Sequence, residues 1–84
     1  MKAYAVIWAA PASAAMEKLD GTIRRRIRAK VLQAATDPER FSIRLVNSPF
    51  RRIRVGDWRV IIHVDKGAIQ VIVIDVGHRR TAYG

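Results

Sequence analysis

Arginine and histidine side chains alternate with apolar side chains along residues 50–64, FRRIRVGDWRVIIHV. The segment consists of two strand-like runs joined by a Gly-Asp turn and is predicted to form a β-hairpin. Because successive side chains of a strand point to opposite faces, Arg52 and Arg54 share one face of the first strand, and Arg59 and His63 share one face of the second. Guanidinium groups on one sheet face repel one another unless an anion binds there. Arginine binds phosphate through paired hydrogen bonds, so the hairpin predicts a phosphate-binding surface.

A second group of basic and aromatic residues follows the last predicted strand, at His78, Arg79, Arg80 and Tyr83. Because neighbouring strands of an antiparallel sheet lie side by side, this end of the chain can place Arg79 and Tyr83 close to the arginines of the hairpin. The combined set is suited to RNA cleavage without a metal, since arginine stabilises the charge of a pentacoordinate phosphate. Guanidinium does not release its proton at ordinary pH. The proton-transfer group is therefore Tyr83, His63 or His78, or water in a strongly positive field.

The formal net charge of +9 favours a polyanionic partner, either nucleic acid or an acidic protein. A membrane surface fits less well, because no predicted helix pairs a lysine-rich face with an apolar aromatic face. The sequence has no cysteine, no carboxylate cluster at ligand spacing and no glycine-rich phosphate loop, so we expect no disulfide, metal site or cofactor. The apolar N-terminal run is broken at Pro11 and is too short for a signal peptide or membrane span. We expect a soluble cytoplasmic protein.

Hydrophobic periodicity predicts the elements that position these residues. Strands are predicted at residues 4–8 and 68–76, helices at about 12–19 and 22–35, and a weak strand at 41–46, in addition to the hairpin. This order indicates one α+β domain, residues 1–84, in which a two-helix hairpin packs on one face of a mostly antiparallel sheet (β-α-α-β-β-β). The basic run of the second helix, from Arg24 to Lys30, has two interpretations: a solvated helix face or a second phosphate-contacting patch.

Two motifs, RIRVGDWRVIIHV and VIVIDVGHRRTAY, resemble the RelE/ParE superfamily of toxin–antitoxin toxins, and the RelE branch in particular. The resemblance extends to the aromatic first strand, the helical hairpin and the Asp-Pro break after it, and therefore to nearly the whole chain. It implies a microbial RNase-like, RelE-like fold. It also implies a metal-independent, ribosome-dependent endoribonuclease (an mRNA interferase) that cleaves mRNA in the ribosomal A site and inhibits translation.

By position in these motifs, the resemblance implies that Arg59 and Arg79 stabilise the phosphate and that Tyr83 stacks on an mRNA base. Arg52 and Arg54 occupy paired basic positions at which the family pattern has lysines, one of them a candidate for proton transfer. Arginine at both positions favours electrostatic activation over a general base. The resemblance and the composition together predict further RNA contacts from neighbouring basic residues, namely Arg51, His63, His78 and Arg80.

Two other functions stay open at this point. A ParE-like toxin of the same fold would inhibit DNA gyrase by protein binding, and its arginines would serve docking or solubility. An inactive member of the fold would bind RNA nonspecifically. Either toxin implies an acidic, partly disordered, RelB-like antitoxin that orders as it lays a helix and a strand across the basic domain. The expected partners are therefore this antitoxin, the ribosome and mRNA, with neither a membrane nor a metal.

Overall fold

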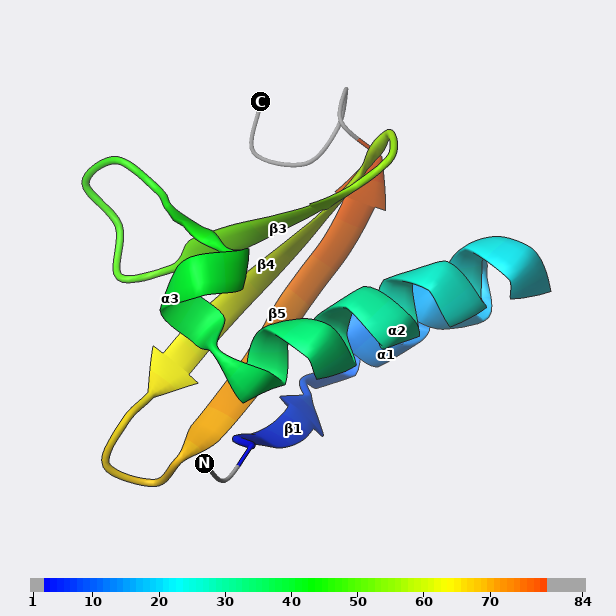
Figure 1. The fold of residues 1–84 in the computed structure, drawn as a ribbon. Helices are drawn as coiled ribbons and strands as arrows, with labels where there is room; N and C mark the ends of the chain where they lie inside the picture. The colour runs from blue at the N-terminus through cyan, green and yellow to red at the C-terminus, as the bar shows by residue number, and fades with distance from the viewer. Residues whose placement is uncertain (1–2, 79–84) are drawn as a thin grey trace.

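The computed structural model of the protein describes residues 3–78. Its elements follow the order strand, three helices and four strands, as drawn in Figure 1. They are β1 (Ala5–Trp8), α1 (Ala10–Glu17), α2 (Gly21–Thr36), α3 (Pro38–Phe41), β2 (Ile43–Arg44), β3 (Arg51–Val55), β4 (Trp58–Asp65) and β5 (Gln70–His78).

The strands form one five-stranded sheet in the order β1-β5-β4-β3-β2. β1 runs parallel to β5, and the other neighbouring strands are antiparallel. The predicted α+β class and the mostly antiparallel sheet are therefore confirmed. The parallel pair requires the chain to cross over between its strands, and the helices lie in this long connection.

Both predicted helices bury the apolar stripes that their sequences indicate. α1 buries Ala12 and Met16, and α2 buries Ile27 and Val31 together with the two alanines near its end. These side chains join one buried cluster with inward-facing residues of β3, β4 and β5. Burial of such apolar surface is the main favourable term in folding, worth roughly 25 cal/mol per Å². Figure 1 shows the two helices on one side of the sheet, which leaves the other side without a helix.

The region between α2 and the hairpin differs from the predicted weak strand. Pro38 occupies the start of the short helix α3, where its missing N–H is not needed, and the helix runs to Phe41. The strand that follows is limited to Ile43–Arg44. The chain then turns through Asn47, whose φ of 55° is tolerated by asparagine, before β3 begins.

The last strand begins two residues later than the sequence indicates. Asp65 Oδ1 accepts a hydrogen bond from the Ala68 N–H at 3.0 Å, which closes the turn between β4 and β5. Ile69 then adopts a φ of 55°, and β5 starts at Gln70. No helix within residues 3–78 is long and apolar enough to cross a lipid bilayer.

Candidate active site on the arginine face of the sheet

The pairing of β3 with β4 places four of the predicted site residues on the sheet face that the helices leave uncovered. Arg52 lies opposite Ile61, and Arg54 lies opposite Arg59. His63 is two residues beyond Ile61 and therefore points to the same side. Ile53, paired with Val60, points to the core instead. We call the side that carries Arg52, Arg54, Arg59 and His63 the arginine face.

The turn of this hairpin depends on Gly56. Its φ of +59° lies in the left-handed region, which glycine enters without steric cost. A Cβ at this position would also lie 3.3 Å from Nη2 of Arg26, so the guanidinium of α2 closely approaches the turn. The glycine thus allows two features at once: a tight β3–β4 connection and the close contact of α2 with the tip of the hairpin.

Within the described part of the chain, the arginines of the arginine face form no ion pair. Arg54 and Arg59 face each other directly across the strand pair, an arrangement of like charges that is destabilising. The ion pair found within residues 3–78 joins Lys66 and Glu39, at the other end of the sheet. Arg54 is exposed and Arg59 half-buried, so both guanidinium groups can approach a ligand. This arrangement favours binding of an anion.

Two polar atoms on the same face are buried without a hydrogen-bond partner among the described residues: Arg52 Nε and His63 Nδ1. Arg52 lies across from Ile61 on β3, and His63 lies two residues beyond it on β4. Ile61 is fully buried although it does not belong to the main core cluster. His63 packs edge to face against Phe50 with a ring-centroid distance of 6.1 Å. A buried polar atom without a hydrogen-bond partner costs about 1–3 kcal/mol, so these two atoms lower the stability of the folded protein.

A β-bulge in β5 adds a carboxylate that the sequence analysis missed. Ile61 pairs with Asp75, whereas Ile62 pairs with Val73, so Ile74 is an extra residue in β5. The bulge keeps Val73 on the core side and places Asp75 on the arginine face, opposite Ile61. An aspartate within an otherwise apolar strand was the available signal, but only the register assigns it to a face.

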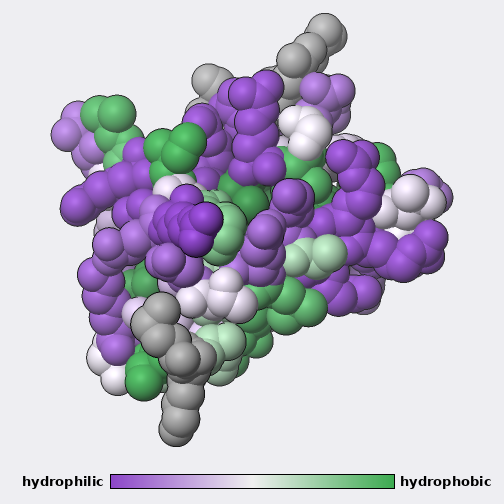
Figure 2. Space-filling view, in the orientation of Figure 1, coloured by the Kyte–Doolittle hydropathy of each residue, from purple (hydrophilic) through white to green (hydrophobic). Residues whose placement is uncertain are grey.

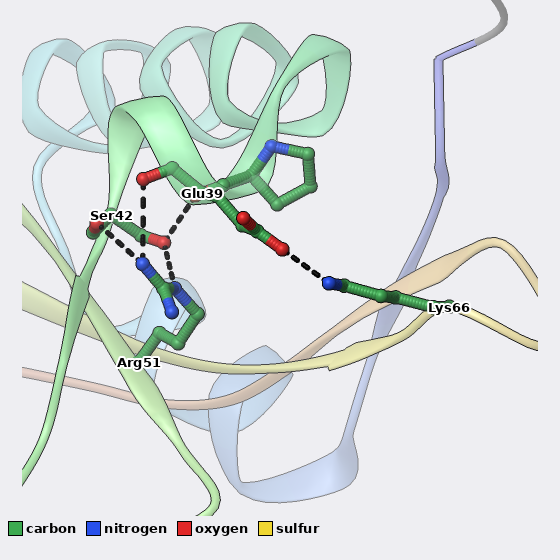
Figure 3. Close-up of polar contacts among 5 residues, drawn as sticks. Glu39, Ser42, Arg51 and Lys66 are labelled. Carbon is green, nitrogen blue, oxygen red and sulfur yellow. Dashed lines mark hydrogen bonds and ion pairs between the residues drawn. The ribbon is translucent and has the colours of Figure 1, made fainter.

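Arg51 lies on the opposite face from the four grouped residues, because it pairs with Ile62. Its Nε donates a hydrogen bond to Ser42 Oγ at 2.6 Å, and its Nη2 donates to the carbonyl oxygens of Ser42 at 3.0 Å and Glu39 at 3.4 Å. Figure 3 shows the guanidinium directed at the end of α3. A cation at this position satisfies carbonyl groups that a helix leaves unpaired at its C-terminus. The structure therefore gives Arg51 a structural task, separate from its predicted RNA contact.

A carboxylate and an ammonium group meet at the same end of the sheet. Glu39 forms an ion pair with Lys66, drawn in Figure 3. A hydrogen bond from Lys66 lowers the pKa of the Glu39 carboxyl below its usual value, and the same bond raises the pKa of Lys66. Both side chains are exposed, so the pair contributes little to stability in water.

His78 also points away from the arginine face. It lies opposite Trp58 across β4 and β5, and the two rings pack edge to face at a centroid distance of 5.4 Å. Arg79, Arg80 and Tyr83 lie outside the described residues. Their predicted approach to Arg59 and its neighbours therefore stays a prediction.

The basic run of α2 occupies a different surface of the molecule. Arg25, Arg26, Arg28 and Lys30 are exposed, and Arg24 is half-buried. Figure 2, which views the molecule from the helix side, shows hydrophilic side chains gathered over this helix. The sheet separates this run from most of the arginine face, so the protein has two distinct basic surfaces. No group of three potential metal-ligating side chains is found within residues 3–78.

Comparison with solved structures identifies the class of protein. A chain of the RelBE2 toxin–antitoxin complex from Mycobacterium tuberculosis superposes with a TM-score of 0.84 at 22% identity, covering 94% of each chain. A chain of the intact Escherichia coli RelBE complex gives 0.80 at 25%, covering 90% of this chain and 96% of that one. The isolated E. coli RelE toxin gives 0.79 at 22%, covering 96% and 89%. The protein has the fold of RelE toxins.

Comparison of the sequence with protein-family models assigns the family. Residues 6–83 match the model of the ParE toxin of type II toxin–antitoxin systems, parDE. The match spans most of the chain, and the protein therefore belongs to this toxin family of the RelE/ParE superfamily. No curated protein sequence matches it significantly.

Proposed function

We propose that this toxin is a metal-independent, ribosome-dependent endoribonuclease, which cleaves mRNA in the ribosomal A site and so inhibits translation in the cytoplasm. The observation that carries the proposal is the arginine face: Arg52, Arg54 and Arg59 lie on one side of a sheet without carboxylate partners among the described residues. Phosphate oxygens accept the charge-assisted hydrogen bonds that these guanidinium groups can donate.

The chemistry of the proposed reaction fits this surface. In RNA cleavage by the 2′-hydroxyl, negative charge develops on the equatorial oxygens of the phosphate in the transition state. Preorganised donors aimed at such charge typically lower the barrier by about 3–4 kcal/mol each. Arg59 stands in the motif position for this task, and Arg52 lies diagonally across the strand pair from it. We propose that Arg79 and Tyr83 complete the site, Arg79 on the phosphate and Tyr83 on a base.

The antitoxin partner follows from the same charge. The similar structures include complexes of RelE with RelB. We propose an acidic, RelB-like partner for this toxin, because a chain of net charge +9 with an unneutralised arginine face requires an anionic cover to be held inactive. Binding of this partner and of mRNA would then compete for the arginine face.

Inhibition of DNA gyrase is the second candidate, and the match to the ParE toxin family is the observation that favours it. A gyrase inhibitor acts by docking on a protein and does not need a site that stabilises a phosphate. Purified gyrase separates the two functions: loss of supercoiling at toxin concentrations that leave mRNA intact supports the ParE-like activity alone.

The test of the proposed function uses purified ribosomes translating a defined mRNA, with cleavage sites mapped by primer extension. Wild type should cut at discrete positions in the A site and leave 2′,3′-cyclic phosphate ends. Arg59→Ala should reduce the cleavage rate by about 10²–10³-fold, the usual effect of losing one preorganised donor. Arg25→Ala, which removes an exposed arginine of α2, is the matched control and should cleave at the wild-type rate. Intact mRNA in the presence of toxic wild-type protein would refute the proposal.

A further inference from the structure

Asp75 is an unusual residue to find on a phosphate-binding surface. The bulge at Ile74 places it opposite Ile61, on the β5 side of the arginine face. Directly opposed side chains have Cβ atoms about 5 Å apart and diagonal ones about 7–8 Å, so Arg59 and His63 are the diagonal neighbours of Asp75 on β4. Arg52 lies on the far side of Ile61, roughly 10 Å away at the strand spacing of ~4.8 Å.

The carboxylate of Asp75 forms no ion pair with the arginines of the described residues. Asp75 forms no ion pair with another residue of the described range, and its Oδ1 accepts the hydrogen bond of the Val76 N–H at 2.8 Å. An unpaired negative charge lowers the affinity of the surface for phosphate, since like charges repel. A carboxylate beside an anion-binding face therefore weakens binding, a cost that a part in the reaction would offset.

The chemistry of the proposed reaction supplies that role. Removal of the 2′-hydroxyl proton needs an acceptor, and guanidinium groups cannot accept one. Asp65, the other aspartate on this side of β4, lies about 13 Å along the strand from Ile61 and is held by the turn through Ala68 N–H. Asp75 is thus the carboxylate of β3, β4 and β5 that lies next to an arginine of this face, namely Arg59.

We propose that Asp75 is the general base of the cleavage reaction, an inference that rests on the proposed endoribonuclease function. A carboxylate oxygen takes the proton of the 2′-hydroxyl as O2′ forms its bond to phosphorus. The bond from phosphorus to O5′ breaks, and O5′ takes a proton from water. The products are a 2′,3′-cyclic phosphate and a 5′-hydroxyl, and Asp75 returns its proton to solvent. Arg59, the diagonal neighbour of Asp75, holds the phosphate beside the carboxylate, and Arg52 supports it from β3.

A purely structural role for Asp75 predicts something different. Its hydrogen bond to Val76 N–H supports the backbone next to the bulge, where the regular ladder is interrupted. Asp75→Asn separates the two roles, because asparagine retains a side-chain oxygen for this hydrogen bond but is neither charged nor a useful base. Asp65→Asn is the matched control: it makes the same change of charge on the same face of the sheet and also retains its turn hydrogen bond.

The experiment measures three quantities for each variant: the thermal midpoint, the affinity for ribosomes carrying an mRNA with a 2′-O-methyl group at the cleavage position, and the single-turnover cleavage rate. Asp75→Asn should keep the wild-type midpoint, bind several-fold more tightly and cleave about 10²–10⁴-fold more slowly, the usual contribution of a general base. Asp65→Asn should match wild type in cleavage.

The outcomes separate the base assignment from the proposed function. Wild-type cleavage together with a rate for Asp75→Asn close to wild type overturns the assignment alone. Slow cleavage accompanied by weaker binding and a lower midpoint shows a structural role and also overturns it. Absence of cleavage by wild type refutes the proposed function, and the assignment fails with it. Tighter binding combined with slower cleavage is the result that supports Asp75 as the base.

Discussion

Replacement of Arg51 by methionine tests the structural task that the fold assigns to this residue. Methionine keeps much of the aliphatic volume but removes hydrogen bonds to Ser42 Oγ, the Ser42 carbonyl and the Glu39 carbonyl. A hydrogen bond contributes about 0.5–1.5 kcal/mol net, and the bond at 3.4 Å stands at the weak end of this range. Ser42 is buried, so water replaces the lost partners poorly. We expect a loss of about 2–3 kcal/mol in the free energy of unfolding.

Thermal unfolding followed by circular dichroism measures this loss. In a domain of this length 1 kcal/mol lowers the midpoint by about 4–8 °C, so Arg51→Met should lower it by roughly 8–24 °C. Arg54→Met is the matched control on the same strand. It removes a charge that faces Arg59 and should leave the midpoint unchanged or raise it slightly. An unchanged midpoint for Arg51→Met, together with weakened RNA binding, would refute the structural role and support the predicted RNA contact.

Three further predictions concern charge and stacking. Lys66 lowers the pKa of Glu39, so the stabilisation by this pair is present above the carboxyl pKa of the unfolded chain and is lost as pH falls through the lower folded value. Lys66→Gln should therefore lose less stability than wild type below about pH 4.5. Urea unfolding at a series of pH values measures this difference. The affinity for a short single-stranded RNA should fall steeply between about 50 and 200 mM salt, because each phosphate contact releases bound counterions. Arg59→Ala should reduce the slope of log affinity against log salt concentration by about 0.7–1. An equal reduction for Arg25→Ala would show that α2 is a second phosphate-contacting surface. The stacking role implied for Tyr83 predicts that Tyr83→Phe retains the wild-type affinity for RNA, whereas Tyr83→Ala loses about 1–3 kcal/mol of binding free energy. Fluorescence anisotropy measures both affinities, and equal affinities for Tyr83→Ala and wild type would exclude stacking.

The sequence by itself determined the features that depend on local periodicity. Side chains alternate along a strand and recur every 3.6 residues along a helix, and burial of the apolar set then orients each element. For this reason the sequence alone assigns Arg52, Arg54 and Arg59 to one sheet face, and the observed register of the hairpin confirms this assignment. Residue type alone grouped Arg51 with the predicted RNA contacts, whereas its pairing with Ile62 places it on the apolar side.

Tertiary structure decided the features that depend on contacts between distant segments. The predicted weak strand at residues 41–46 shortened to Ile43–Arg44, and the short helix α3 formed before it. Pro38 begins this helical turn, and its end is capped by Arg51, a partner far along the chain. β1 joined β5 in parallel, a pairing between distant segments that local periodicity does not indicate. Above all, the bulge at Ile74 moved Asp75 to the arginine face. A one-residue shift reverses the face of every side chain beyond it, and the energy that selects the shift comes from pairing with β4 and from the core.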